Sequence, residues 1–223
     1  RKLYYSMQMN YARDFGKHGV TALALFSRDK YASGSEFAHY REDWVFRLTY
    51  NWALRYFAEF NGAYNGSEKF SSDKRFAFFP SVSGGWMISE EPFMASLREK
   101  SILDMLKLRI SWGRVGDDSI GGRWLYQDAY SYGVNVVMGS INPGNTPYTF
   151  YKIATLGNPN IGWETVEKRN FGLDFSVFGG LIAGSVDYFN DVRNDILIGG
   201  GSRAIPSYFG ATAPSANLGE TKS

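Results

Sequence analysis

Regular alternation of apolar and polar residues over long stretches is the feature that most constrains this sequence. In the clearest stretch, residues 44–52, aromatic and aliphatic side chains take every second position. Successive side chains of a strand point to opposite faces, so each such stretch predicts a β-strand with one apolar and one polar face. The stretches run for about 9 to 13 residues, which suits a tilted strand that crosses a membrane. Similar alternation recurs at residues 3–11, 80–88 and 106–112.

Two hairpins are expected from this pattern. In the first, Gly179 and Gly180 provide the positive φ that a two-residue turn needs, so residue i should face residue 359 − i, and Val177 should face Ile182. In the second, a three-residue loop at residues 54–56 should pair residue i with residue 110 − i. In both registers the apolar side chains share one face and the polar side chains share the other.

Eight strands are expected along the chain, joined alternately by short turns and long loops. They cover residues 3–12, 20–28, 42–53, 57–66, 76–89, 105–114, 164–178 and 181–191. Short turns on one side and long loops on the other are typical of outer-membrane barrels. Residues 90–104 are the exception, because Ser89 as a cap, acidic residues in the first turn and an early proline predict a short helix there.

Aromatic residues gather near the ends of the expected strands, as in the interfacial girdles of membrane barrels. The predicted fold class is therefore all-β, an antiparallel transmembrane β-barrel. A soluble antiparallel sandwich, whose strands also alternate, and a small closed barrel of eight strands are the alternatives. The aromatic residues in question are Trp44, Trp52, Tyr56, Trp86, Trp112, Phe171 and Tyr188.

Composition and motifs give no support to an enzyme. The chain has 24 basic and 22 acidic residues, no cysteine and two histidines, so nothing points to nucleic acid, an iron–sulfur cluster or a cysteine-ligated zinc ion. The acidic pairs at residues 90–91 and 117–118 are adjacent in sequence, whereas catalytic carboxylates converge across a cleft. The phosphate-binding pattern GxxxxGK[ST] does not occur. We therefore expect no catalytic residue, no metal ligand and no cofactor.

Seven short sequence motifs give information beyond the alternation. They are residues 55–57 (RYF), 66–70 (GSEKF), 78–86 (FFPSVSGGW), 106–113 (LKLRISWG), 158–164 (NPNIGWE), 170–175 (NFGLDF) and 217–220 (NLGE). In this order they resemble the barrel of the SusC/RagA group of TonB-linked outer-membrane transporters, which are TonB-dependent receptors. The likeness covers most of the chain and is weakest at residues 115–157.

The resemblance implies an importer of glycan or peptide oligomers in the bacterial outer membrane of Bacteroidota. It implies a 22-stranded barrel around a plug domain, a SusD-like surface lipoprotein as partner and TonB as the source of energy. Residues 1–223 would then be part of one barrel domain and supply about eight of its strands. We expect the plug and the TonB-binding region to lie outside these residues. The alternative function is that of a soluble β-rich binding or structural module.

Two groups of residues are candidates for function. Charged residues on the polar rows would line the barrel lumen, where they contact the plug or a solute or are simply hydrated; these are Arg47, Glu59, Lys107, Arg109, Lys168, Asp174 and Asp187. Aromatic residues in the long loop at 115–163 present flat rings that suit sugar rings or a protein partner, although self-packing of the loop needs the same residues. They are Trp124, Tyr126, Tyr130 and Tyr132.

Overall fold

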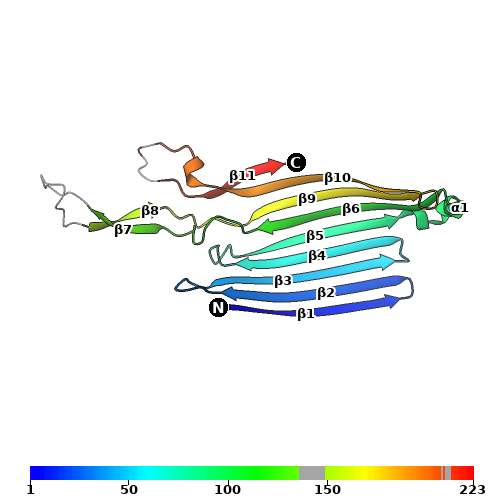
Figure 1. The fold of residues 1–223 in the computed structure, drawn as a ribbon, viewed down its shortest axis with the longest axis horizontal. Helices are drawn as coiled ribbons and strands as arrows, with labels where there is room; N and C mark the ends of the chain where they lie inside the picture. The colour runs from blue at the N-terminus through cyan, green and yellow to red at the C-terminus, as the bar shows by residue number, and fades with distance from the viewer. Residues whose placement is uncertain (136–148, 207, 209–211) are drawn as a thin grey trace.

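A computed structural model describes residues 1–135, 149–206, 208 and 212–223. Nine strands form one antiparallel sheet: β1 (Lys2–Phe15), β2 (His18–Tyr31), β3 (His39–Trp52), β4 (Tyr56–Ser67), β5 (Phe76–Met87), β6 (Leu103–Asp117), β9 (Glu164–Val177), β10 (Ile182–Ile198) and β11 (Ala216–Lys222). They lie side by side in that order, with β1 and β11 at the two edges (Figure 1). Strands β7 (Ala129–Asn135) and β8 (Thr149–Thr155) pair separately and extend from the left-hand end in Figure 1.

The all-β prediction is confirmed, and all eight expected strands are present with shifted ends. The sheet is open, because its first and last strands lie at opposite edges, so the small closed barrel is wrong. Within the described ranges no second sheet is stacked on this one to make a sandwich. The sequence pattern missed β7, β8 and β11, each of which has only seven residues.

Connections at the two ends of the sheet differ in length, as expected. Two to four residues separate β1 from β2, β3 from β4 and β9 from β10 at one end, which we call the short-turn end. The connections at the other end, the long-loop end, include residues 32–38, 68–75 and 118–163. The expected helix at the short-turn end is present as η1 (Ile88–Glu90), η2 (Pro92–Met94) and α1 (Ala95–Glu99).

Ser89 does not cap that helix, contrary to expectation. It lies inside η1, where it is buried, and no side-chain cap hydrogen bond is present at η1, η2 or α1. Among the described residues, no helix has the length and hydropathy needed to cross a membrane.

The hairpin between β9 and β10 has the predicted register. Val177 faces Ile182, and the pairing continues without interruption to Thr165 and Asn194. Both turn glycines have positive φ, +64° at Gly179 and +83° at Gly180. The two glycines and the alternation therefore select the same register.

The predicted register of the β3–β4 hairpin is wrong by two residues. Trp52 faces Tyr56 instead of Ala58, so residue i pairs with residue 108 − i. The turn comes one residue earlier than expected because Ala53 and Leu54 both adopt positive φ. Alanine and leucine rarely adopt this conformation, so the sequence does not indicate it. A shift of two leaves every side chain on its predicted face.

The two faces of the sheet have opposite character. One cross-strand row runs through Tyr56, Trp86, Leu108, Leu173 and Val186, and this face carries most of the exposed large apolar side chains. The other face carries mainly polar and charged side chains. Because lipid surrounds a membrane barrel and water fills it, the apolar face is the outward one. We call the two faces the outward face and the polar face.

Aromatic side chains of the expected girdle lie on this outward face. Trp44, Trp52, Tyr56, Trp86, Phe171 and Tyr188 are exposed, and Trp112 is half-buried. Rings from neighbouring strands pack against one another, as in the stacked pair Tyr56 and Trp86, with centroids 6.2 Å apart. Such side chains are stable against lipid and at its boundary with water.

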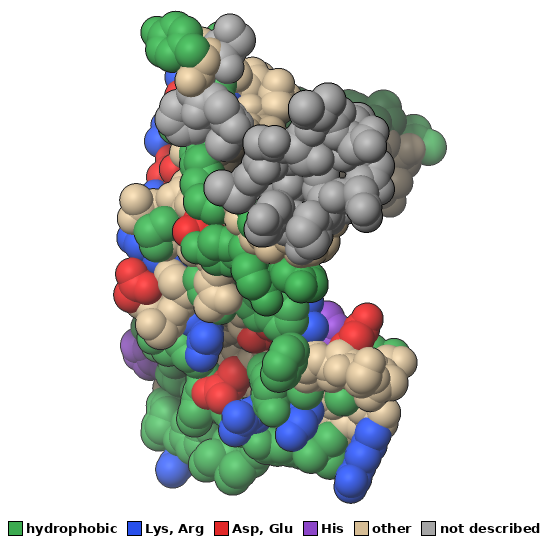
Figure 2. Space-filling view, turned by 90° about the vertical axis from the view of Figure 1, so that its left-hand side faces the viewer, with side chains coloured by type: hydrophobic (Ala, Val, Ile, Leu, Met, Phe, Trp, Pro, Cys, Tyr) green, Lys and Arg blue, Asp and Glu red, His purple; other side chains and the backbone are tan. Residues whose placement is uncertain are grey.

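A small buried core lies at the long-loop end and not within the sheet. Phe70, Phe79, Ile120, Ile161 and Trp163 pack together there. Four of the five come from loops and one, Phe79, from the polar face of β5. Viewed from this end, the surface is hollowed on one side, and charged side chains of both signs are interspersed with hydrophobic ones (Figure 2). The loop residues of this core therefore pack over the polar face at this end.

Candidate functional site

Three charged side chains from three neighbouring strands meet on the polar face. The Arg109 guanidinium of β6 donates two hydrogen bonds of 2.8 Å to the Asp174 carboxylate of β9. It also lies 3.3 Å from the Asp187 carboxylate of β10. A bidentate arginine–carboxylate pair has a defined geometry, so this cluster fixes the orientation of three side chains on the wall.

Gly172 leaves room for this cluster. It faces Arg109 directly across the strands, and a Cβ there would lie 2.7 Å from the guanidinium carbon and 2.8 Å from a carboxylate oxygen of Asp187. Any larger residue at this position would push the guanidinium away from its partners. The conformational freedom of glycine is not needed here, only its lack of a side chain.

The remaining predicted wall residues also lie on the polar face. Arg47 donates a 2.8 Å hydrogen bond to Glu59, and Lys168 lies 3.2 Å from Asp191. The Lys107 ammonium lies 4.9 Å from the centre of the Phe57 ring and is in no ion pair within the described part of the chain. The wall thus carries paired charges of both signs, which suits a water-filled interior.

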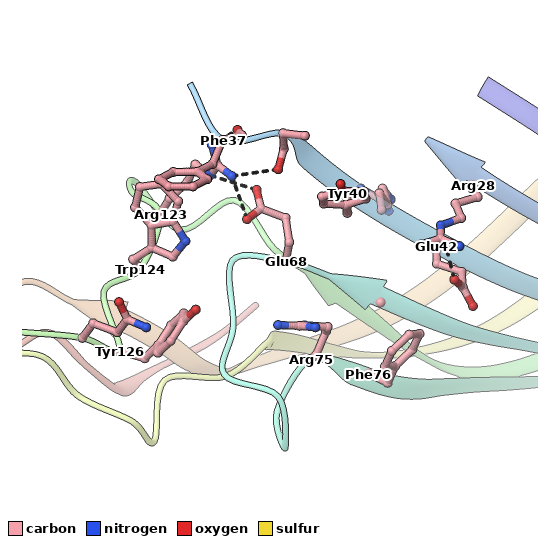
Figure 3. Close-up of a pocket in the computed structure, with 14 residues that line it drawn as sticks. Arg28, Phe37, Tyr40, Glu42, Glu68, Arg75, Phe76, Arg123, Trp124 and Tyr126 are labelled. Carbon is pink, nitrogen blue, oxygen red and sulfur yellow. Dashed lines mark hydrogen bonds and ion pairs between the residues drawn. The ribbon is translucent and has the colours of Figure 1, made fainter. Parts of the chain in front are cut away.

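A hollow that we call the rim pocket lies at the long-loop end (Figure 3). It has a volume of about 830 Å³. Its floor is a single cross-strand row, Arg28, Glu42, Gly66 and Phe76, contributed by β2, β3, β4 and β5. Loop residues form its upper wall: Phe37, Ala38, Glu68, Arg123, Trp124, Tyr126 and Gln127.

Arg123 ties three loops together at this pocket. Its guanidinium donates hydrogen bonds to the backbone carbonyls of Phe37 (2.9 Å) and Ala38 (3.1 Å) and lies 3.0 Å from the Glu68 carboxylate. The Glu68 carboxylate also lies 3.2 Å from His39. The side chains of Arg123 and Glu68 are largely buried, so their ion pair is shielded from solvent and holds the wall in place.

Trp124 packs edge-on against Phe37, with ring centroids 5.7 Å apart, and the Arg123 guanidinium lies 4.5 Å from the Trp124 ring. Much of the Trp124 ring is therefore committed to internal contacts. Tyr126 belongs to the same loop wall of the pocket (Figure 3).

The four predicted loop aromatics do not form one surface. Trp124 and Tyr126 line the rim pocket, whereas Tyr130 and Tyr132 lie on β7, where they are 63% and 67% exposed. The Tyr132 ring contacts Tyr151 of β8, with centroids 4.7 Å apart. The two pairs therefore have different surroundings, one built into a pocket and one on a projecting hairpin.

The sequence pattern alone did not indicate Phe37, Glu68 and Arg123 as parts of this site. Glu68 lies within the string at residues 66–70 that carries the family resemblance, and Arg123 directly precedes a predicted aromatic. Nothing local signals that these residues meet, because Arg123 is 86 residues from Phe37 and 55 from Glu68 along the chain.

A second polar cluster lies at the short-turn end. The Tyr56 hydroxyl and the Trp86 indole donate hydrogen bonds of 2.7 Å and 3.0 Å to the same oxygen of Glu91. The Tyr56 hydroxyl first, and then the indole, lower the pKa of the Glu91 carboxyl below its ordinary value.

Within the described residues no group of three or more His, Cys, Asp and Glu side chains is placed to hold a metal ion.

No protein-family model matches the sequence. Among curated proteins, the TonB-dependent receptor SusC of Bacteroides thetaiotaomicron is 36% identical over 151 residues, which is 68% of this chain and 14% of that receptor. The chain is a SusC/RagA-like member of the TonB-dependent receptors. The TonB-dependent receptor P26 of Formosa agariphila is 30% identical over 173 residues, or 78% of this chain and 16% of that receptor. The chain thus spans about one sixth of these receptors or less.

Solved structures agree with this membership in fold. The RagAB peptide importer in its closed-closed state matches 99% of this chain and 26% of the solved chain, with a TM-score of 0.79 and 22% identity. A second structure of the RagAB peptide transporter matches with a TM-score of 0.78. SusC-type and RagA-type TonB-dependent receptors are outer-membrane proteins, and this SusC/RagA-like chain is accordingly an outer-membrane barrel segment. The named relatives are receptors and importers rather than enzymes.

Proposed function

We propose that this chain forms part of the barrel wall and outer loops of a TonB-energised importer of glycan or peptide oligomers. The importer would work with a SusD-like surface lipoprotein and would have no catalytic activity. The main support is the sheet itself, which is apolar on one face, charged on the other, and similar over 99% of the chain to a peptide importer. The 22-stranded barrel, its plug and its TonB-binding region would be completed by residues beyond these 223.

The polar face would line the lumen in this importer. Its ion pairs, such as Arg109 with Asp174, neutralise most of the wall charge, so the wall would contact the plug and passing solute through hydroxyl, amide and paired charged groups. Lys107, which faces Asp174 across the strands but is in no ion pair among the described residues, would be available to an acidic group of the plug or solute.

Tyr130 and Tyr132 would be the contacts to substrate or lipoprotein. Their rings are exposed on the projecting β7–β8 hairpin, and exposed tyrosines are well suited to sugar rings and to protein partners. Trp124 and Tyr126 would contribute less to this contact because they are built into the rim pocket.

Uptake by cells that lack the parent receptor tests the proposal. We expect uptake of labelled oligosaccharide or oligopeptide pools to be lost, to return with the wild-type receptor and to stay absent when TonB is deleted. The double variant Tyr130→Ala with Tyr132→Ala should reduce uptake or co-purification of the lipoprotein severalfold, with barrel assembly intact. Its matched control is Tyr188→Ala, which removes an exposed tyrosine from the outward face. Normal uptake without the receptor, or a parent protein that is soluble without detergent, would contradict the proposal and favour a soluble module.

A further inference from the structure

The rim pocket is built on the outward face of the sheet, not on the face that lines the lumen. Two residues along each strand from its floor lies the row Phe26, Trp44, Tyr64 and Phe78, which belongs to the aromatic outward face. Side chains two residues apart on a strand point to the same side. The floor residues Arg28 and Phe76 therefore face outward as well, one step nearer to the long loops.

This position corresponds to the level of lipid headgroups. In membrane barrels the aromatic girdle marks the boundary between hydrocarbon and water, and the residues just beyond it meet the polar parts of the lipids. Trp44 belongs to this boundary, because its ring is exposed while its indole nitrogen donates a 3.0 Å hydrogen bond to Glu42 in the floor of the pocket.

Positive charge predominates around the pocket. Its lining includes four arginines and two glutamates, Arg28, Arg41, Arg75, Arg123, Glu42 and Glu68. Arg123 is paired with Glu68, and Arg41 is paired with Asp43 and Asp118 outside the lining. The pairing of Arg28 with Glu42 is loose, at 3.8 Å. Arg75 is in no ion pair within the described ranges, and its Nε atom is buried without a hydrogen-bond partner. In Figure 3 Arg75 lies beside Phe76, and Arg28 lies above them beside Glu42. Arg75 and the loosely paired Arg28 are therefore the guanidinium groups of this lining that an anion could reach.

We propose that the rim pocket binds the phosphorylated headgroup of an anionic membrane lipid. Arg28 and Arg75 would bind phosphate oxygens, for which the guanidinium fork is well matched. Tyr126 and Trp124 would cover the headgroup from above, and Phe76 and the aromatic row below it would contact the acyl chains. A basic pocket at the membrane boundary is suited to such headgroups.

A lipid fits the pocket better than a transported solute does. A solute that passes through the lumen meets the polar face, whereas the floor of this pocket belongs to the outward face. The inference depends on the outer-membrane position of the chain and not on what the importer carries. It can therefore fail while the importer proposal stands, and the reverse also holds.

The test uses the full-length receptor in nanodiscs of phosphatidylethanolamine, with lipid A, a phosphorylated glucosamine lipid, as the probe. We expect wild-type receptor to retain labelled lipid A and to retain much less of a dephosphorylated form. The double variant Arg28→Gln with Arg75→Gln should bind lipid A about tenfold more weakly, because each guanidinium–phosphate contact is charge-assisted. Normal heat-modifiable migration will show that the variant barrel is assembled.

Arg169→Gln is the matched control, since Arg169 faces outward on β9, is 57% exposed and pairs with Glu167 far from this pocket. Equal loss in the control and the double variant would mean that surface charge alone attracts the lipid, and would overturn the proposal. Unchanged binding in the double variant would overturn it too. If the double variant does not assemble, equal retention of lipid A and its dephosphorylated form by wild-type receptor remains the result that refutes the site.

Discussion

The sheet and the loop cluster at its end place their apolar side chains in opposite ways. Across the sheet, Leu48, Val82 and Ile110 are exposed on the outward face and charged groups lie on the polar face. In the loop cluster, Phe70 and Ile161 are fully buried beneath polar loops. The sheet is suited to lipid on one side, where pairing between neighbouring strands satisfies their polar main-chain groups. The loops fold as a small water-exposed domain would, around a buried core.

The largest effect is expected when this core is removed. Phe70→Ala deletes a fully buried ring that packs on Trp163, with centroids 5.2 Å apart, and should cost about 3–5 kcal/mol of local stability. The loops at the long-loop end should then be nicked rapidly by protease while the barrel keeps its heat-modifiable migration. Phe93→Ala, at an exposed position of the short-turn end, serves as the control and should leave both unchanged. Loss of the barrel together with the loops would contradict the separation of the two regions.

A charge moved from one face of the sheet to the other is expected to have the next largest effect. Val82→Arg places a guanidinium on the outward face in the middle of β5 and should cost about 2–4 kcal/mol in a bilayer. Its neighbour Ser83 faces Glu59 on the polar face, so Ser83→Arg should cost much less. Urea midpoints of the two variant receptors refolded into vesicles compare them directly. Equal destabilisation would mean that the two faces have been assigned wrongly.

The smallest effect is expected at the short-turn end, where the Glu91 carboxylate holds Tyr56 and Trp86 through hydrogen bonds. The pKa of Glu91 is lowered, first by the Tyr56 hydroxyl and then by the Trp86 indole, so its contribution to stability is present above the ordinary glutamate pKa of about 4.3. That contribution should be lost as the pH falls from this value through the lowered pKa of the folded state. Tryptophan fluorescence followed during acidification should show a transition that Glu91→Gln abolishes. The control is Glu90→Gln, because Glu90 pairs with Arg98 instead, and this variant should keep the transition. If Glu90→Gln also abolished the transition, a titrating group other than Glu91 would be responsible.

The sequence predicted the sheet better than it predicted the site, for reasons visible in single residues. The β9–β10 register followed from Gly179 and Gly180. The predicted β3–β4 register was off by two residues because Ala53 and Leu54 adopt positive φ, which no glycine in the sequence indicates at this turn. The seven wall residues could be assigned to one face from alternation alone. Their partners could not, because Arg109 reaches Asp187 from a strand 78 residues away.

Alternation therefore determined by itself that this chain forms long two-faced strands, since the direction of each side chain along a strand depends only on local backbone geometry. The sequence also determined which side chains share the apolar face and which share the polar face. Only the tertiary structure decided that Phe37, Glu68 and Arg123 meet, that Trp124 and Tyr126 separate from Tyr130 and Tyr132, and that the floor of the rim pocket belongs to the outward face. Those outcomes depend on how three loops far apart in the sequence pack together, and no local repeat encodes that packing.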